Sequence, residues 1–231
     1  MLKAEKAIFP YHRKLGKYCY NENMENVIIQ RDPIVTDALA HLRDKATDTK
    51  RFRKYADSIS YQLLGAAVSE NDLEEKEIET PLTKTTTQVF RQNFVFITIL
   101  RAGLAMLPAV FKIFPSIPVG FVGLKRDEKT AIAHEYYANV PAINSETIVL
   151  LADPMLATGG SMISAIRKIN LYNPKEIRLI SIVCAPEGIA AVHNEFPNIK
   201  IVTAAVDSQL NDKKYIVPGL GDFGDRYFCT E

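Results

Sequence analysis

Five short, nearly continuous apolar runs stand out in the C-terminal two thirds of the chain. They are FVFITIL (94–100), PVGFVG (118–123), TIVLLAD (147–153), IRLISIVC (177–184) and KIVTAAV (200–206). Strands that are buried on both faces have this composition, because neither side of such a strand meets water. Helical segments intervene at 103–113, 160–171 and 187–195. The alternation predicts an α/β fold, with a mostly parallel sheet flanked by helices and right-handed crossovers.

The N-terminal third is instead predicted to form a helical arm. Pro33 suits a first helical turn, and Asp48 or Thr49 suits the cap of a second helix. Apolar residues recur at the helix period after each of these positions. They are Val35, Ala38, Leu39 and Leu42 in the first helix and Phe52, Tyr55, Ala56, Ile59 and Leu63 in the second.

Three polar segments depart from the alternation. Residues 65–87 are polar and acidic, and we interpret them as a loop with a short edge strand. Residues 124–142 are charged first and aromatic later. Because they are too polar for a crossover helix, they are predicted to form a hairpin flap that projects from the sheet. Residues 208–231 show little periodicity and are dense in glycine and proline, which predicts a structured loop of the kind that carries function.

Composition narrows the class of protein. The 231 residues are 47% hydrophobic and 24% charged, which is enough to bury one core without a disulfide or a metal. We therefore interpret 1–231 as a single domain with residues 1–31 as an N-terminal extension. Lys plus Arg number 28 against 27 for Asp plus Glu, and the net charge of +1 argues against a protein that coats nucleic acid or an anionic membrane.

The expected compartment is the cytoplasm. Cys19, Cys184 and Cys229 lie far apart, which gives neither a disulfide framework nor a zinc-ligand spacing and favours a reducing environment. No run approaches the ~20 apolar residues of a membrane span, and the first residues hold no apolar core of signal-peptide length. The four histidines have no metal-ligand spacing and are interpreted as surface or structural residues.

The strongest local signal is DPMLATGGS at 153–161, between the apolar TIVLLA and the helical SMISAIRKI. Ligands of open α/β sheets bind beyond the carboxyl ends of the strands. A glycine turn that opens a helix presents free N–H groups and the positive end of the helix dipole to an anion. Thr158 and Ser161 can add hydroxyl donors. Because no Lys follows the second glycine, a phosphomonoester fits better than a triphosphate.

The same residues allow a plainer interpretation, in which Gly-Gly-Ser only starts a helix and Ser161 caps it. Asp153 favours the ligand site instead. Its carboxylate cannot bind phosphate, but it can accept hydrogen bonds from vicinal sugar hydroxyls. Donors for a phosphate and an acceptor for hydroxyls on one loop predict a ribose 5-phosphate site.

The loop resembles the phosphoribosyl diphosphate (PRPP) signature of type I phosphoribosyltransferases, and the form DPMLATGGS resembles that of uracil phosphoribosyltransferases. Further stretches resemble motifs of that family in the expected order. They are ILRAG (99–103), RDEKT with EYY (126–130 and 135–137), APEGI (185–189) and YIVPGLGDFGDR (215–226). The resemblance runs from about Asp32 to the C-terminus. It implies a phosphoribosyltransferase-like fold and the transfer of the 5-phosphoribosyl group from PRPP to uracil, giving UMP and diphosphate in pyrimidine salvage.

The resemblance also implies roles for particular residues. The leaving diphosphate needs positive charge, which falls to Arg101 and Arg126, with Mg²⁺ carried by PRPP rather than held directly by the protein. The implied PRPP contacts are Arg101, Arg126, Asp153, Pro154, Met155, Leu156, Ala157, Thr158, Gly159, Gly160, Ser161 and Asp222. The implied uracil contacts are Ile216, Gly221, Asp222 and Phe223. Fixed contacts of this kind would reject cytosine, because the wrong base leaves polar groups unpaired.

Each charged residue also has a structural interpretation. Arg101 directly follows an apolar strand and could pair with a neighbouring acid instead. Arg126 could belong to a solvated, charged hairpin. Asp222 lies close to glycines as in a calcium loop, but the alternating aspartates of such a loop are absent.

Three positions depart from the family pattern. Lys129 stands where an acidic residue is usual, residues 65–67 (Gly-Ala-Ala) replace a Tyr-Glu-Ala-Thr-like stretch, and Phe223 stands where many bacterial members have Ala and others Phe. Two other hypotheses therefore stay open: a non-catalytic nucleotide sensor on the same fold, and the same chemistry on another base. The family further implies a homodimer or higher homo-oligomer, with Tyr136 and Tyr137 at the interface, and some of its members are activated by GTP.

Overall fold

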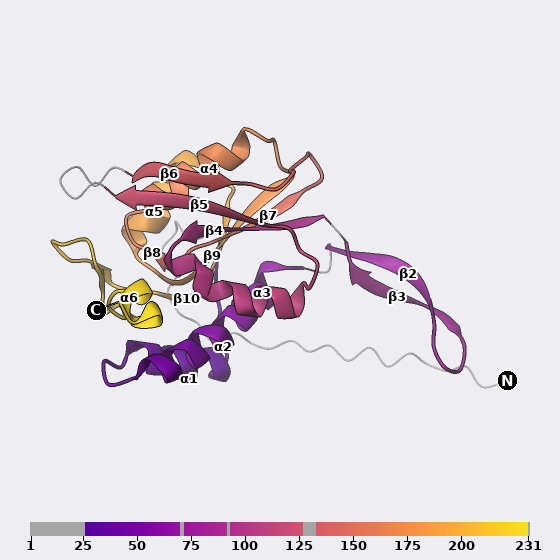
Figure 1. Cartoon of the computed structure of the whole chain (residues 1–231), viewed down its shortest axis with the longest axis horizontal. Coiled ribbons are helices and arrows are strands. Elements are labelled where there is room, and N and C mark those ends of the chain that lie inside the picture. Colours follow the sequence, from indigo (N-terminus) through magenta and orange to yellow (C-terminus); the bar gives the residue numbers. More distant parts are fainter. Residues whose placement is uncertain (1–25, 70–71, 92, 127–132, 231) are drawn as a thin grey trace.

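The computed structural model describes residues 26–69, 72–91, 93–126 and 133–230. Among them, the main sheet has the order β1-β10-β9-β7-β4-β5-β6, with β8 paired to β9 (Figure 1). Its strands are β1 (Val27–Ile29), β4 (Phe94–Leu100), β5 (Val119–Arg126), β6 (Ala133–Asn139), β7 (Ile148–Ala152), β8 (Met155–Leu156), β9 (Glu176–Cys184) and β10 (Lys200–Val206). Each pairing is parallel except that of β5 with β6, so the carboxyl ends of the parallel strands meet at one edge. The predicted mostly parallel sheet is confirmed.

Helices cover both faces of the sheet. One face carries α1 (Pro33–Arg43), α2 (Thr49–Ala67), a 3-10 helix (Ala102–Met106), α3 (Leu107–Ile113) and α6 (Phe223–Phe228), and the other carries α4 (Gly160–Asn170) and α5 (Pro186–Glu195). The strands divide their side chains between the two faces with a period of two. In β4, Phe94 and Phe96 join the first core, whereas Val95 and Ile97 join the second. Burial on both faces is why β4 is apolar along its whole length.

Both predicted N-terminal helices form, each behind an aspartate cap. Asp32 accepts hydrogen bonds from the Ile34 and Val35 N–H groups, and Asp48 accepts one from the Arg51 N–H. These caps satisfy donors that a helix start leaves without an intrahelical partner. Of the two caps that the sequence allowed for the second helix, the structure uses Asp48, and Thr49 is the first helical residue.

The interpretation of residues 65–87 as a loop is wrong. Helix α2 continues to Ala67, and then β2 (Leu73–Glu79) and β3 (Lys84–Phe90) pair antiparallel over seven residues each. The hairpin projects from the body of the molecule (Figure 1). Since nearly all of both strands is exposed, they carry no alternation of apolar and polar residues, which is the signal that marks a half-buried strand.

A buried ion pair ties the base of this hairpin to the main sheet. Arg178 in β9 donates from Nη1 to Asp72 Oδ2 at 2.6 Å and from Nη2 to Asp72 Oδ1 at 3.0 Å. Its Nη1 also donates to the Ala67 carbonyl at 2.8 Å. Burial raises the pKa of Asp72, but hydrogen bonds from Arg178 and Ser69 outweigh burial and keep that pKa below its ordinary value. Asp72 directly precedes β2, so the pair fixes where the hairpin leaves the body.

The other two polar segments fold partly as predicted. Within 124–142, β5 runs to Arg126 and pairs antiparallel with β6, which confirms a hairpin; residues 127–132, including Lys129, lie outside the described part. Within 208–230, the loop is structured but also contains β11 (Gln209–Leu210), β12 (Ile216–Val217) and α6. Strand β1 was not predicted, since it lies inside the segment interpreted as an extension. No helix in the described ranges is long and apolar enough to cross a membrane.

Candidate active site

Residues from three distant segments line one cavity of about 200 Å³ at the carboxyl edge of the sheet. The lining residues are Ala102, Asp153, Met155, Ala157, Tyr215, Ile216, Gly221, Asp222, Phe223 and Gly224. Parallel strands deliver the first two segments, because β4 ends one residue before Arg101 and β7 ends one residue before Asp153. The cavity therefore brings together the first part of the predicted phosphate loop and the predicted base loop.

The predicted phosphate loop is a compact turn between β7 and α4. Met155 and Leu156 form β8, which pairs with the end of β9, and Asp153 Oδ1 accepts a hydrogen bond from the Met155 N–H at 3.4 Å. Gly159, with φ +82°, is the cap of α4, so the alternative in which Ser161 caps the helix is wrong. Ser161 lies instead in the first turn, where helix N–H groups have no intrahelical partner and can bind an anion.

Gly188 in α5 packs directly against this turn. A Cβ on Gly188 would lie 2.4 Å from the Ala157 oxygen and 2.8 Å from the Leu156 oxygen. A Cβ on Gly159 would in turn lie 3.0 Å from the Gly188 oxygen. The APEGI motif therefore has a structural use that sequence reasoning missed, since its glycine lets the backbone of α5 touch the backbone of the loop.

Arg101 lies at the end of β4 with its side chain 64% exposed. Its Nη2 is 3.7 Å from Asp225 Oδ1, so the expected alternative of an acidic neighbour is present, but as a long, solvent-accessible pair. The peptide bond between Leu100 and Arg101 is cis. Behind the arginine, a Cβ on Gly103 would lie 1.9 Å from Thr98 Oγ1, so only a glycine lets the 3-10 helix turn so closely onto β4. Arg126 ends β5, and its side chain lies outside the described part.

Asp222 and Phe223 form the start of α6. Asp222 is the cap, and its Oδ1 accepts a hydrogen bond from the Asp225 N–H at 2.9 Å. Phe223 is only 1% exposed, and its ring packs edge-on against Phe52 with centroids 5.1 Å apart. Its side chain therefore belongs to the core, although the residue lines the cavity. Asp222 is a helix cap, which leaves no support for a calcium loop.

Two arginines and an aspartate hold the predicted base loop; sequence reasoning missed Arg43 and Asp207 and gave no role to Arg226, the last residue of the motif at 215–226. Arg43 and Asp207 bind the backbone of Gly219, and Arg226 donates to the Leu220 carbonyl at 2.7 Å. Asp207 carries a signal that could have pointed to it, because it directly follows the apolar run 200–206, just as Asp153 follows 147–152. Nothing local marks Arg43, which ends a helix far away in the sequence.

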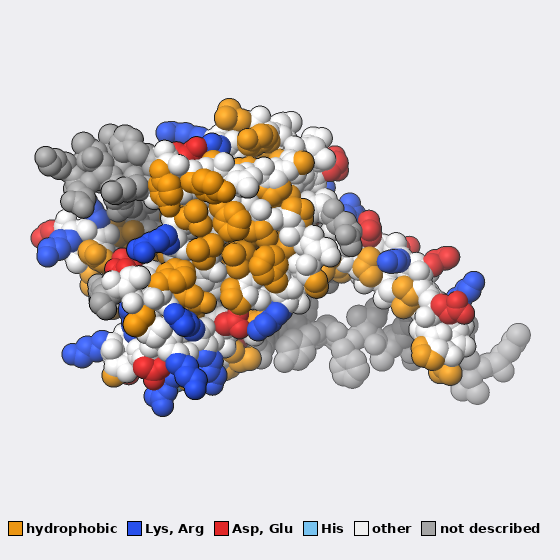
Figure 2. Space-filling model, in the orientation of Figure 1, with side chains coloured by type: hydrophobic (Ala, Val, Ile, Leu, Met, Phe, Trp, Pro, Cys, Tyr) orange, Lys and Arg blue, Asp and Glu red, His pale blue; other side chains and the backbone are white. Residues whose placement is uncertain are grey.

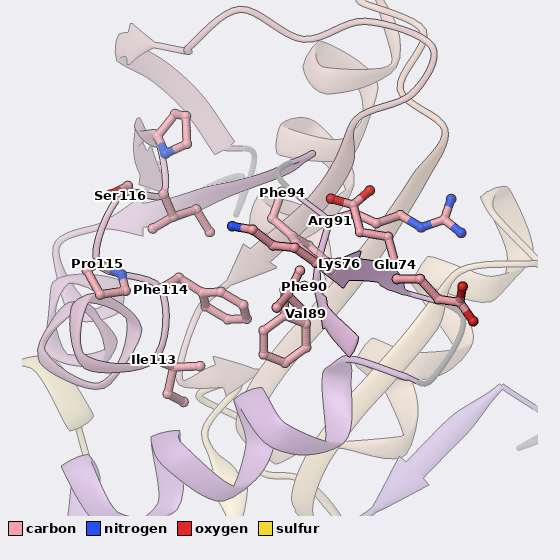
Figure 3. Close-up of a pocket in the computed structure, with 13 residues that line it drawn as sticks. Glu74, Lys76, Val89, Phe90, Arg91, Phe94, Ile113, Phe114, Pro115 and Ser116 are labelled. Atoms are coloured by element: carbon pink, nitrogen blue, oxygen red, sulfur yellow. The ribbon is translucent and has the colours of Figure 1, made fainter. Parts of the chain in front are cut away.

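A larger cavity lies elsewhere, at the opposite edge of the sheet. It measures about 750 Å³ and lies between the β2–β3 hairpin and the end of α3 (Figure 3). Its floor is aromatic: the Phe90 and Phe114 rings are 5.2 Å apart and the Phe94 and Phe114 rings 5.5 Å apart. Phe94 begins β4, whereas ligands of such sheets bind where the strands end. This cavity holds none of the residues predicted for chemistry.

Comparisons with known proteins agree with the motifs of the sequence. The family model for uracil phosphoribosyltransferase matches residues 29–230. The uracil phosphoribosyltransferase of Campylobacter fetus is 43% identical over 207 residues, which is 90% of this chain and 99% of the relative. That of Bacillus thuringiensis is 44% identical over 200 residues, 86% of this chain and 96% of the relative.

Solved structures agree with the fold. A protein of Aquifex aeolicus matches with a TM-score of 0.84 at 34% identity, covering 89% of this chain and 99% of that chain. An adenine phosphoribosyltransferase of Leishmania donovani matches with a TM-score of 0.53 at 14% identity, covering 84% of this chain and 89% of that chain, and shares the fold alone.

Proposed function

This chain belongs to the uracil phosphoribosyltransferase family, and from this membership we propose how it converts uracil and PRPP into UMP and diphosphate, the reaction of pyrimidine salvage. One observation carries the proposal. The cavity at the carboxyl edge is lined both by Asp153 and Ala157 of the predicted phosphate loop and by Ile216 and Gly221 of the predicted base loop. A sugar phosphate on the first group of residues and a base on the second would meet at the anomeric carbon.

The phosphate loop binds the 5′-phosphate of PRPP. Free N–H groups at the start of α4 and the hydroxyls of Thr158 and Ser161 donate to the phosphate oxygens. Asp153, at the head of the loop, accepts from the ribose hydroxyls. The left-handed backbone of Gly159 supports this role, because it turns the chain so that α4 begins directly after the loop.

Arg101 stabilises the diphosphate as it leaves. The reaction passes through an oxocarbenium-like state, so the protein contributes mainly positioning and charge rather than covalent chemistry. The exposed guanidinium can exchange its long contact with Asp225 for diphosphate oxygens, since a solvent-accessible pair of this kind contributes little. Arg126 contributes a second cation from the hairpin flap when the flap closes.

Mg²⁺ supplies charge neutralisation to the diphosphate when it is bound together with PRPP. Asp153 and Asp222 are the two carboxylates that line the cavity, and carboxylate oxygens are the ligands that Mg²⁺ prefers. Two carboxylates fit a metal that arrives on its substrate rather than one held in a protein cage. Within the described ranges, no group of three or more acidic, histidine or cysteine side chains could hold a metal.

Uracil is bound by backbone groups of Ile216, Gly221 and Phe223. The buried side chain of Phe223 supports this, because it leaves only the backbone of that residue to face the cavity. An Ala or a Phe at this position offers the same backbone groups to the base, although the Phe ring also fills the core beside Phe52. Fixed backbone donors and acceptors distinguish uracil from cytosine, because the wrong base leaves them unpaired.

The non-catalytic sensor has no observation in its favour. The departure at residues 65–67 lies at the end of α2, where the Ala67 carbonyl contacts Arg178 near the start of β9. That point belongs to the edge of the sheet opposite the cavity, so the departure leaves the proposed site unchanged.

We also propose that the enzyme is a cytoplasmic homodimer. Figure 2 shows hydrophobic side chains gathered on one face, over the region of β5, β6 and α3. Tyr136 and Tyr137 on β6 and Phe111 on α3 are exposed, and exposed aromatic residues are typical of interfaces. Sedimentation analysis tests the state, and a protein that stays monomeric at every concentration contradicts it.

One assay tests the function. The purified protein is incubated with Mg²⁺, PRPP and either uracil, cytosine, hypoxanthine or no base, and diphosphate and nucleotide are measured. We expect nucleotide, namely UMP, only in the reaction that contains uracil. Product with another base would assign the same chemistry to that base instead of uracil. No product with any base would overturn the proposed function. The Asp153→Asn and Thr158→Val variants are each expected to lose most of the PRPP-dependent product; near-normal turnover in both removes the phosphate loop from the proposal.

A further inference from the structure

A partly buried ion pair holds both polar backbone groups of one glycine in the base loop. Arg43 and Asp207 form a two-pronged pair, with Nη1 to Oδ2 at 2.8 Å and Nη2 to Oδ1 at 2.6 Å. The same Nη1 donates to the Gly219 carbonyl at 2.7 Å, and the same Oδ2 accepts from the Gly219 N–H at 2.8 Å. The guanidinium and the carboxylate that neutralise each other therefore hydrogen-bond to the carbonyl and the N–H of Gly219, respectively.

Gly219 can be held in place only through its own backbone groups. Its φ is +59°, and a Cβ there would lie 2.2 Å from the Ile216 oxygen. The chain therefore folds back on Ile216, and no side chain at 219 can anchor it. The Asp207 side chain is 4% exposed, so its hydrogen bonds to Arg43 and Gly219 form away from water, where they are strong and costly to lose.

A second arginine ties the next residue, Leu220, to the C-terminal end of α1. Arg226 donates from Nη1 to the carbonyls of Leu220 and Leu42 and from Nη2 to the Asp44 carbonyl. Leu42, Arg43 and Asp44 are consecutive at the end of α1. The end of this helix is thus tied to residues 219 and 220, which lie between Ile216 and Gly221 of the cavity wall.

We propose that the Arg43–Asp207 pair is the positioning element of the base subsite, and that it sets the affinity for the base without touching it. The inference rests on the proposed function, since it assumes that uracil contacts Ile216 and Gly221. The hydrogen bonds described above join the pair to Gly219, and none of them goes to the loop at 153–161 or to Arg101. It therefore governs the binding of the base and leaves the binding of PRPP nearly unchanged.

The Arg43→Lys variant tests this role. A lysine keeps the positive charge beside Asp207 but lacks the planar fork that reaches the carboxylate and the Gly219 carbonyl together. We expect the KM for uracil to rise about tenfold, as for the loss of one charge-assisted hydrogen bond, with the KM for PRPP changed less than about twofold. Selectivity for uracil over cytosine should fall in parallel.

Arg167→Lys is the matched control. Arg167 forms an equally short two-pronged pair with Glu195 at the surface, with both contacts at 2.6 Å, and touches no loop residue. This variant should keep both KM values. Thermal unfolding of both variants shows whether each is folded.

Asp207→Asn supplies a second test that keeps the size of the side chain and removes its charge. It should also raise the KM for uracil more than the KM for PRPP. An unchanged uracil KM in folded Arg43→Lys and Asp207→Asn proteins, or equal rises in both KM values, overturns the inference while the function stands. If the unmodified chain forms no UMP, both the function and the inference fall.

Discussion

The α-carbon of Gly188 lies directly against the carbonyl of Ala157, so that a Cβ on Gly188 would be 2.4 Å from that oxygen. This contact fixes how close the loop proposed to bind phosphate lies to α5. Both neighbours in this contact are backbone, and backbone cannot rotate away as a side chain can. The relationship makes the loop sensitive to a single methyl group in a different helix.

Gly188→Ala should therefore weaken PRPP binding without altering any residue that contacts it. We expect kcat/KM for PRPP to fall by about 100-fold, because shifts near 1 Å in positioning groups cost that much. Steady-state kinetics with PRPP as the varied substrate measure the effect.

The matched control for this change is Gly65→Ala. A Cβ at Gly65 meets no atom within 4 Å, and the residue lies in α2, where alanine favours the helix by about 1 kcal/mol. The control should keep full activity with equal or greater stability. Wild-type kinetics in the Gly188→Ala protein would show that the loop tolerates displacement.

Arg101→Ala should lower kcat/KM by about 100-fold or more, since a preorganised charge at the leaving group contributes that much to the transition state. Stability should change little, because the ion pair that Arg101 forms with Asp225 is long and exposed. Arg51→Ala is the control, since Arg51 forms a pair with Asp48 that is also 3.7 Å long and exposed. An equal, small effect of both variants on kcat/KM would remove Arg101 from the site.

Asp72→Asn should destabilise the protein by about 2 kcal/mol near neutral pH, because it removes one of the two carboxylates that pair with the buried Arg178 cation, the other being Glu176. The pKa of Asp72 is lowered in the folded state, so its ionised form contributes stability above the unfolded pKa and loses it as the pH falls through the folded pKa. The free-energy difference between wild type and variant should therefore shrink as the pH drops below about 4. Urea unfolding across this range measures it, and a difference that is independent of pH would contradict the assigned charge state.

The described cysteines should differ sharply in reactivity. Cys184 is fully buried at the end of β9, and burial raises its pKa to about 12, whereas Cys229 is exposed. Because the thiolate is the reactive form, a maleimide at about pH 8 should modify Cys229 in the native protein and Cys184 only after unfolding. Peptide mass spectrometry reads out each site. Rapid native labelling of Cys184 would show that the sheet opens locally.

Elements whose signal is local were predicted correctly. The apolar runs 94–100 and 200–206 coincide with β4 and β10, and Asp48, one of the two predicted candidates, caps α2, whereas the Asp32 cap of α1 was not predicted. The β2–β3 hairpin was missed, because strands exposed on both faces have no need of apolar alternation. Strand β1 was missed because it has three residues and pairs with β10, more than 170 residues further along the chain.

The sequence by itself determined the parallel core, the glycine turn between β7 and α4 and the family, because buried strands and glycine turns impose their residue types on neighbouring positions. Only the tertiary structure decided how the loops are held. The Arg43–Asp207 pair on Gly219 joins residues 164 positions apart, and the Gly188 contact joins the backbones of a helix and a loop. Such contacts depend on where the strands deliver their ends in space, and no local pattern of residues records that placement.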